Sequence, residues 1–131
     1  MPAASQYQAS TIVVAADAAL ASSLELALQA AGLTVIVYDP AHGLADLPLD
    51  VAMTLIADHR VLTPNPVGFV ATLRARHWDG LVIVMTGDGE AQRVAFEGAW
   101  RVSILEMPFV GADLIAAIRA VWPALDGSTP A

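Results

Sequence analysis

The chain has 131 residues, enough for one domain that buries roughly two thirds of its unfolded surface in a single core. Hydrophobic residues make up 56% of it and charged residues only 15%, so we expect apolar surface to remain for a partner. Six basic against thirteen acidic side chains give a net charge of −7, which argues against binding to nucleic acid or anionic membranes. The lack of cysteine excludes disulfides, thiolate metal ligands and cysteine nucleophiles.

The sequence predicts a short tail at each end of the domain. We expect residues 1–10 and 124–131 to flank one domain that spans residues 11–123. The N-terminal MPAASQYQAS has neither the basic region nor the apolar segment of a signal peptide, and no apolar run approaches the ~18 residues of a membrane span. A cytoplasmic location is therefore the default expectation.

In the first half of the chain, short apolar runs alternate with a helical pattern. Leucines at positions 20, 24 and 28 recur every fourth residue and predict an amphipathic helix that Gly32 closes. The later segment 44–50, LADLPLD, is too short and too proline-broken for more than one or two helical turns. Three runs have the composition of buried strands: 11–15 (TIVVA), 33–38 (LTVIVY) and 51–57 (VAMTLIA).

The second half repeats this alternation. Pro66 suits the first turn of a helix, and Phe69, Val70 and Leu73 give that helix an apolar stripe. Further on, the sequence predicts strands at 81–85 (LVIVM) and 102–105 (VSIL), and helices at 89–99 and 111–122.

Five βα units with nearly continuous apolar strands predict an α/β fold, a doubly wound parallel sheet with helices on both faces. Ligands of such sheets gather at the carboxyl ends of the strands. We therefore expect Asp58, Thr86 and the segment after Ala15 to lie on one rim.

The order and spacing of these elements resemble a response-regulator receiver domain from about Thr11 to Trp122. The resemblance implies the CheY-like, flavodoxin-like strand order 2-1-3-4-5. It also implies an acidic pair after strand one, a phosphoaccepting aspartate after strand three, a Thr or Ser after strand four and a Lys-Pro after strand five. Matching residues are Asp58, Thr86 and Pro108.

The remaining reactive positions of a receiver have been replaced. The acidic pair falls at Ala15 and Ala16, and the lysine position holds Met107. Receivers use the pair and the aspartate to hold Mg²⁺, and the lysine to balance the new charge. Alanine cannot ligate magnesium and methionine carries no charge, so this resemblance implies a site with little orthodox phosphotransfer.

Several roles remain open for Asp58: a phosphoacceptor, a metal ligand, half of an ion pair, or the polar end of a buried strand. Arg60 lies two residues on and either pairs with Asp58, in place of magnesium or lysine, or points into solvent. Asp17, one residue beyond the missing pair, either turns toward the site or caps the first helix. His59 is a candidate for a proton-sensitive contact with Asp58.

Thr86 has two readings, a residual signalling role and a strand-end hydroxyl bonded to backbone. The aromatic residue that moves with it in receivers is replaced by Ile104. Met107-Pro108 occupies a place where receivers often have a cis peptide, and Phe109 is expected to pack in the core.

No cofactor or metal site is expected. The glycines of TGDGE, residues 86–90, lack the rest of a phosphate-binding motif, and His42, His59 and His77 do not have metal-ligand spacing. No nucleophile-elbow motif supports a hydrolase.

Large aromatic residues predict an interaction surface near the last two helices. Phe96 and Trp100 are expected to face outward there and to form a homodimer interface, whereas Trp122 has the helical phase of a core residue. The alternative interface is the Ala- and Leu-rich first helix.

Three functional hypotheses follow. The leading one is an atypical stand-alone receiver that acts as a protein-interaction module, with a histidine kinase or other signalling protein as its partner. The second is a phosphorelay receiver still phosphorylated on Asp58 by a histidine kinase or phosphotransfer protein. The third, an enzyme on a flavodoxin-like scaffold, lacks a recognisable cofactor site.

Overall fold

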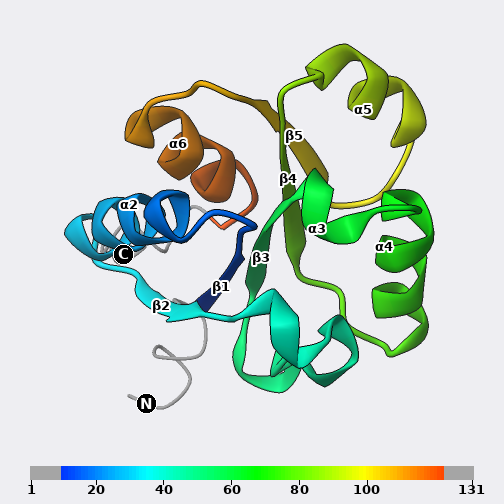
Figure 1. The fold of residues 1–131 in the computed structure, drawn as a ribbon, viewed down its shortest axis with the longest axis horizontal. Coiled ribbons are helices and arrows are strands. Elements are labelled where there is room, and N and C mark those ends of the chain that lie inside the picture. Colours follow the sequence, from blue (N-terminus) through cyan, green and yellow to red (C-terminus); the bar gives the residue numbers. More distant parts are fainter. Residues whose placement is uncertain (1–9, 123–131) are drawn as a thin grey trace, which may run out of the picture.

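The computed structural model describes residues 10–122 and shows a five-stranded parallel sheet between two layers of helices (Figure 1). The strand order is β2-β1-β3-β4-β5, as expected. The strands are β1 (Ser10–Val14), β2 (Thr34–Val37), β3 (Thr54–Asp58), β4 (Leu81–Thr86) and β5 (Val102–Glu106). The α-helices are α2 (Ala18–Ala30), α3 (His59–Leu62), α4 (Pro66–Ala75), α5 (Gly89–Ala95) and α6 (Gly111–Val121).

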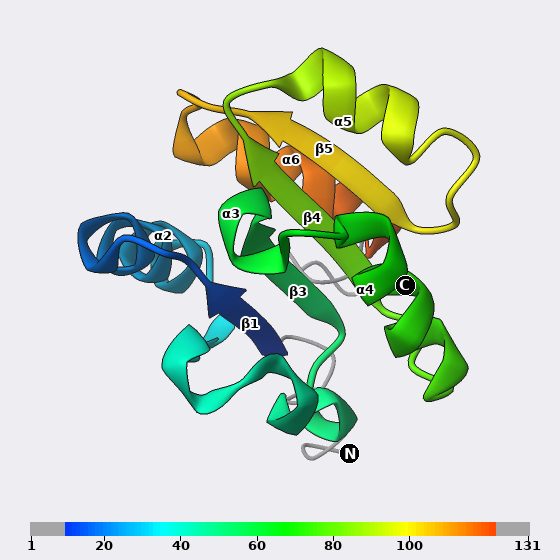
Figure 2. The ribbon, with the colours of Figure 1, turned by 45° about the vertical axis from the view of Figure 1, so that its right-hand side comes forward.

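The sheet separates two hydrophobic clusters, one under each helical layer. Helices α2 and α6 cover one face, and α3, α4 and α5 lie on the other (Figures 1 and 2). Successive residues of β1 point to opposite faces, so Ile12 belongs to the cluster under α4 and Val13 to the cluster under α2 and α6. All five residues of the central strand β3 are buried.

Between β2 and β3 the chain forms no α-helix. Its place is taken by three short 3₁₀ helices, η1 (Pro40–His42), η2 (Leu44–Asp46) and η3 (Leu49–Val51). Pro48 interrupts this segment, and each 3₁₀ turn is closed by local backbone hydrogen bonds. This agrees with the one or two turns that the sequence predicts for this segment.

Every strand boundary except the starts of β4 and β5 differs from the predicted one, by one to three residues. The third strand begins at Thr54 rather than at Val51, because Val51 closes η3 and the carbonyl of Ala52 accepts a hydrogen bond from the indole of Trp78 at 3.0 Å. Ser10, assigned to the N-terminal tail, belongs to β1, where it pairs with Thr34. Both tails otherwise lie outside the described residues.

Helix α5 is shorter than predicted, and this changes the place of Phe96. The helix ends at Ala95, and Gly98 follows with φ +78°, a conformation that favours glycine and stops the helix. Phe96 is only 6% exposed and packs in the cluster that contains Val70 and Trp78. The expectation that Phe96 faces outward is therefore wrong.

Candidate functional site

Asp58 ends the central strand, and its carboxylate lies at the carboxyl edge of the sheet. The side chain is 0% exposed. Its backbone is extended, and Oδ1 accepts a hydrogen bond from the Arg60 N–H at 3.0 Å, so Asp58 is the N-cap of α3. Helix α3 was not expected from the sequence, and its first turn directs Arg60 back over the strand end.

The guanidinium of Arg60 pairs with the Asp58 carboxylate. Arg60 Nε donates to Oδ1 at 3.1 Å and to Oδ2 at 2.9 Å, and Nη2 donates to Oδ2 at 2.5 Å. Both carboxylate oxygens are therefore engaged, although the Arg60 side chain itself is 54% exposed. Of the four roles considered for Asp58, this geometry contains two, half of an ion pair and the polar end of a buried strand.

The pair controls the ionisation of Asp58. Burial disfavours the carboxylate and acts to raise its pKa. The side-chain and backbone hydrogen bonds from Arg60, together with its charge, outweigh burial and hold the pKa of Asp58 below the usual value of 3.8. His59 Nδ1 lies 3.9 Å from Asp58 Oδ1 and has no hydrogen-bond partner among the described residues.

The positions of the missing acidic pair offer no oxygen ligands. Ala15 is buried and Ala16 is exposed just after β1. Asp17 caps α2, because its Oδ1 accepts a hydrogen bond from the Ala19 N–H at 2.8 Å. The hydrogen bond and the charge of Asp58 are the main causes that raise the pKa of Arg60. The charge of Asp17 also raises it.

Thr86 ends β4, one register position beyond the residue that pairs with Asp58. Its hydroxyl is fully buried and accepts a hydrogen bond from the Asp88 N–H at 3.0 Å, as the backbone-bonded reading predicts. The Met107 N–H donates to the Thr86 carbonyl at 2.7 Å, and the Met107-Pro108 peptide is cis. The side chains of Met107 and Phe109 pack against the cluster under α2 and α6.

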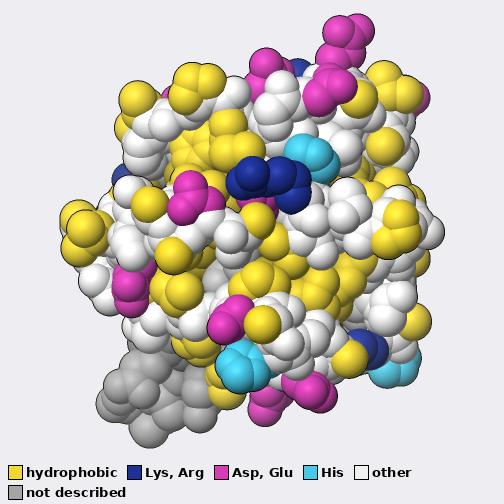
Figure 3. Space-filling model, in the orientation of Figure 1, with side chains coloured by type: hydrophobic (Ala, Val, Ile, Leu, Met, Phe, Trp, Pro, Cys, Tyr) yellow, Lys and Arg dark blue, Asp and Glu magenta, His cyan; other side chains and the backbone are white. Residues whose placement is uncertain are grey.

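These residues do not fit the magnesium ion that receivers hold. Mg²⁺ requires several oxygen ligands, and here the one buried carboxylate is already bound to a cation. Within residues 10–122, no three His, Asp or Glu side chains group in a way that would hold a metal. Figure 3 shows this face of the molecule, with basic side chains next to acidic and histidine side chains near its centre.

A second cluster of polar and aromatic groups lies at the opposite, amino ends of β4 and β5. Arg74 of α4 donates from Nη1 to the carbonyls of Trp78 and Gly80, and from Nη2 to the carbonyls of Trp100 and Arg101. Sequence reasoning missed this cluster. The only signal was that arginine and tryptophan recur close together in LRARHW and WR, which does not reveal contacts across 26 or 27 residues.

The tryptophans belong to the same cluster. Trp100 is 57% exposed, in agreement with the expectation that it faces outward, and the guanidinium groups of Arg74 and Arg101 lie 5.4 and 4.4 Å from the centre of its ring. Trp122 is half-buried against the cluster under α2 and α6, and Arg101 also stacks on its ring.

Comparison with known proteins supports the fold. The response regulator receiver domain protein from Clostridium thermocellum is 17% identical, with 91% of this chain and 95% of that chain covered and a TM-score of 0.72. The response regulator receiver protein from Sinorhizobium medicae is 23% identical, with 90% of this chain and 97% of that chain covered and a TM-score of 0.70. The beryllofluoride-activated NtrC4 receiver domain dimer is 19% identical, with 90% of this chain and 99% of that chain covered and a TM-score of 0.71.

No family model matches the sequence, and no curated protein is similar to it at a significant level. The chain thus has the fold of CheY-like receiver domains, as the order of its elements predicts. No helix of the described residues combines the length and apolar character needed to cross a membrane.

Proposed function

We propose that this chain is an atypical receiver that acts as a protein-interaction module in two-component signalling, without orthodox Mg²⁺-dependent phosphorylation. One observation carries the proposal: Arg60 occupies both oxygens of Asp58. The guanidinium supplies, within the chain, the positive charge that magnesium and lysine supply in receivers.

Phosphoryl transfer to Asp58 would have to overcome this pair. The attacking carboxylate oxygen needs a free lone pair, and a cation must offset the charge of the incoming phosphoryl group. Each lost electrostatic contact of this kind costs about 10²–10³ in rate. With alanine at 15 and 16 and methionine at 107, the site lacks the groups that would replace Arg60.

The output of such a module goes through other proteins. We propose a histidine kinase or another signalling protein as the partner, a cytoplasmic location and no enzymatic activity. We also propose a homodimer, since the mean hydropathy of +0.60 is high for one core and Trp100 remains exposed. The NtrC4 receiver domain of the same fold is a dimer.

The test is intact-protein mass spectrometry after incubation with acetyl phosphate or phosphoramidate and Mg²⁺. We expect the mass to stay unchanged. An Asp58→Asn variant, which keeps the shape of the side chain, is the matched control. Gain of one phosphoryl group by the wild type but not by Asp58→Asn would overturn the proposal.

A phosphorelay receiver is the second candidate, favoured by the exposure of Arg60. Because this side chain is 54% exposed, rotation into solvent would free the buried carboxylate beside Thr86. In that case a histidine kinase or phosphotransfer protein phosphorylates Asp58, and Arg60→Ala accelerates the reaction. Absence of phosphate on both the wild type and Arg60→Ala eliminates this candidate.

A further inference from the structure

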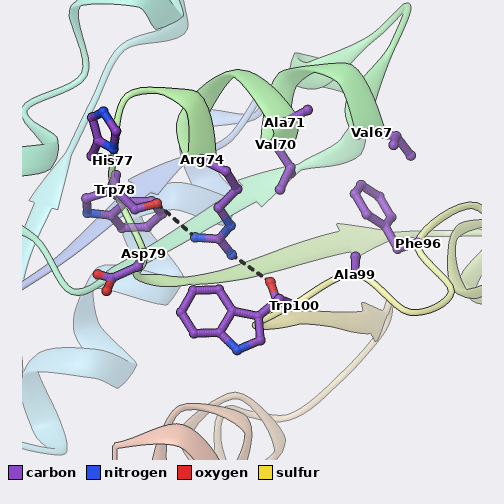
Figure 4. A pocket seen from close by; sticks show the side chains of 10 residues that line it. All are labelled: Val67, Val70, Ala71, Arg74, His77, Trp78, Asp79, Phe96, Ala99 and Trp100. Atoms are coloured by element: carbon purple, nitrogen blue, oxygen red, sulfur yellow. Dashed lines mark hydrogen bonds between the residues drawn. The ribbon is translucent and has the colours of Figure 1, made fainter.

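A groove of about 520 Å³ lies between α4 and the segment that joins α5 to β5 (Figure 4). Its walls are mostly apolar, and Val67 and Trp100 expose large parts of their side chains at its edge. Figure 4 shows Arg74 extending from α4 toward Trp100 across the groove. The groove lies far from the Asp58 site, because Arg74 bonds to the carbonyls just before β4 and β5 begin.

One arginine, Arg74, lines the groove, and a second, Arg101, lies beside it on this acidic protein. Arg74 is bound by four carbonyls and Arg101 by the carbonyl of Asp79, and neither guanidinium forms an ion pair within residues 10–122. Burial is the main cause that lowers the pKa of Arg74, the Asp79 charge opposes it, and Arg101 lowers it further. The lining itself carries one cation, Arg74, and one carboxylate, Asp79, so the surplus positive charge comes from Arg101, whose charge reaches Arg74 from beside the groove.

The complement of this groove is on the same chain. Glu90, Val94 and Glu97 are exposed. Glu90 and Val94 are four residues apart and share one side of α5, and Glu97 follows two residues after the helix ends at Ala95. Val94 is 71% exposed. Neither glutamate has a basic partner among the described side chains. We call these three residues the α5 ridge.

We propose that a second copy of this chain binds the groove through its α5 ridge, with Glu97 near Arg101 and Val94 against Trp100. The proposal specifies the surface of the homodimer proposed above and rests on it. The ridge and the groove adjoin, because Phe96 and Ala99, on either side of Glu97, line the groove. A twofold axis beside α5 therefore allows both copies to make the contact, which closes the assembly at a dimer.

Charge explains why this surface suits a second copy. Two chains of net charge −7 repel each other over most of their surfaces. At the groove, acidic side chains instead meet cations that form no ion pair within residues 10–122, and the apolar groups of both sides leave water. Opposite charges thus fix the register of the two copies, while Val94 and Trp100 contribute apolar contact.

Charge reversal tests the pairing. Sedimentation equilibrium should show that Glu97→Arg and Arg101→Glu each weaken dimerisation ~10-fold or more, since each places like charges opposite one another. The double variant restores the pair in the opposite sense and should dimerise far better than either single variant. A double variant as weak as the singles contradicts the Glu97–Arg101 contact.

Two further variants keep the test independent of folding. Arg101 bonds to the Asp79 carbonyl, so Arg101→Glu needs a circular-dichroism melt, whereas Val94→Glu removes an exposed contact and should give monomers with an unchanged melt. Leu26→Glu on α2, a position 69% exposed, is the matched control and should leave the dimer intact.

The outcomes separate this surface from the proposed function. A wild type that is monomeric at several hundred micromolar overturns the homodimer and this surface together, while the phosphorylation test decides the rest of the proposed function independently. A dimer that is indifferent to Val94→Glu and Glu97→Arg overturns this surface alone. Dissociation by Leu26→Glu instead would assign the interface to α2.

Discussion

Arg60 lies at the carboxyl ends of the strands and Arg74 at the amino ends of β4 and β5, and the two guanidinium groups have different partners. Arg60 binds the buried carboxylate of Asp58, two residues away. Arg74 binds four backbone carbonyls, two of them 26 and 27 residues away, and no carboxylate. The first cation is neutralised inside the chain, while the second joins separate segments and keeps its charge.

This difference indicates which end of the sheet can still bind a charged partner. A carboxylate whose oxygens both accept from an arginine has little capacity left for a metal or a phosphoryl group. A cation held by carbonyl dipoles is fixed in position, yet its net charge still attracts an anion. The Asp58 site is thus closed electrostatically, and the opposite end of the sheet is open.

The largest effect is expected from Arg74→Met, which keeps the apolar stem and removes the guanidinium. The carbonyls of Trp78, Gly80, Trp100 and Arg101 lose their common donor, and we expect the free energy of unfolding to fall by about 2–3 kcal/mol in urea titrations. Arg76→Met, on the exposed C-cap of the same helix, is the control and should change stability by less than about 0.5 kcal/mol. Equal effects for both variants would mean that the carbonyl contacts add nothing.

A second prediction concerns the pKa of Asp58 in an Arg60→Met variant. In the wild type the contacts from Arg60 outweigh burial and keep the pKa below 3.8. The variant loses the side-chain hydrogen bonds and the charge of Arg60 but keeps the backbone N–H of residue 60, and burial is the largest cause that remains, so the pKa of Asp58 should rise. NMR titration of the Asp58 carboxyl carbon measures the change, and a pKa that stays low in the variant contradicts the dominant role of Arg60.

The same rise in the pKa of Asp58 changes how stability depends on pH. In the wild type, the folded-state pKa lies below the unfolded one, so the contribution of Asp58 is present above about pH 4 and is lost as pH falls through the folded pKa. In Arg60→Met the folded pKa is higher than in the wild type, so less of this stabilisation is present above about pH 4 and less of it is lost as pH falls. Unfolding curves of the two proteins should therefore converge toward acid pH.

The sequence predicted the fold well because the local signals agreed. Continuous apolar strands, the leucine spacing of α2 and Pro66 at the start of α4 all report local preferences, and the observed order β2-β1-β3-β4-β5 follows from them and the receiver resemblance. The error at Phe96 came from extending α5 past Ala95, where helical periodicity no longer gives the direction of a side chain.

The two arginine sites were predictable to different degrees. Asp58 and Arg60 are two residues apart, so their pairing could be listed among the alternatives, although only the unanticipated helix α3 explains the return of the side chain. The partners of Arg74 lie in the turns before β4 and β5. Such contacts depend on tertiary placement, which local patterns in a single sequence do not encode.

The smallest effect is expected from adding Mg²⁺, which tests whether the Asp58 site is closed to a metal ion. Mg²⁺ sheds its water reluctantly and here finds one carboxylate already paired with Arg60 and another, Asp17, bonded to the first turn of α2. Millimolar Mg²⁺ should therefore leave both the melting temperature and the tryptophan fluorescence unchanged. Saturable stabilisation by about 1 kcal/mol or more would show that the site still takes the ion. If Asp17→Asn, which retains a side chain able to cap α2, abolished that stabilisation, Asp17 would have left its cap to serve as a ligand.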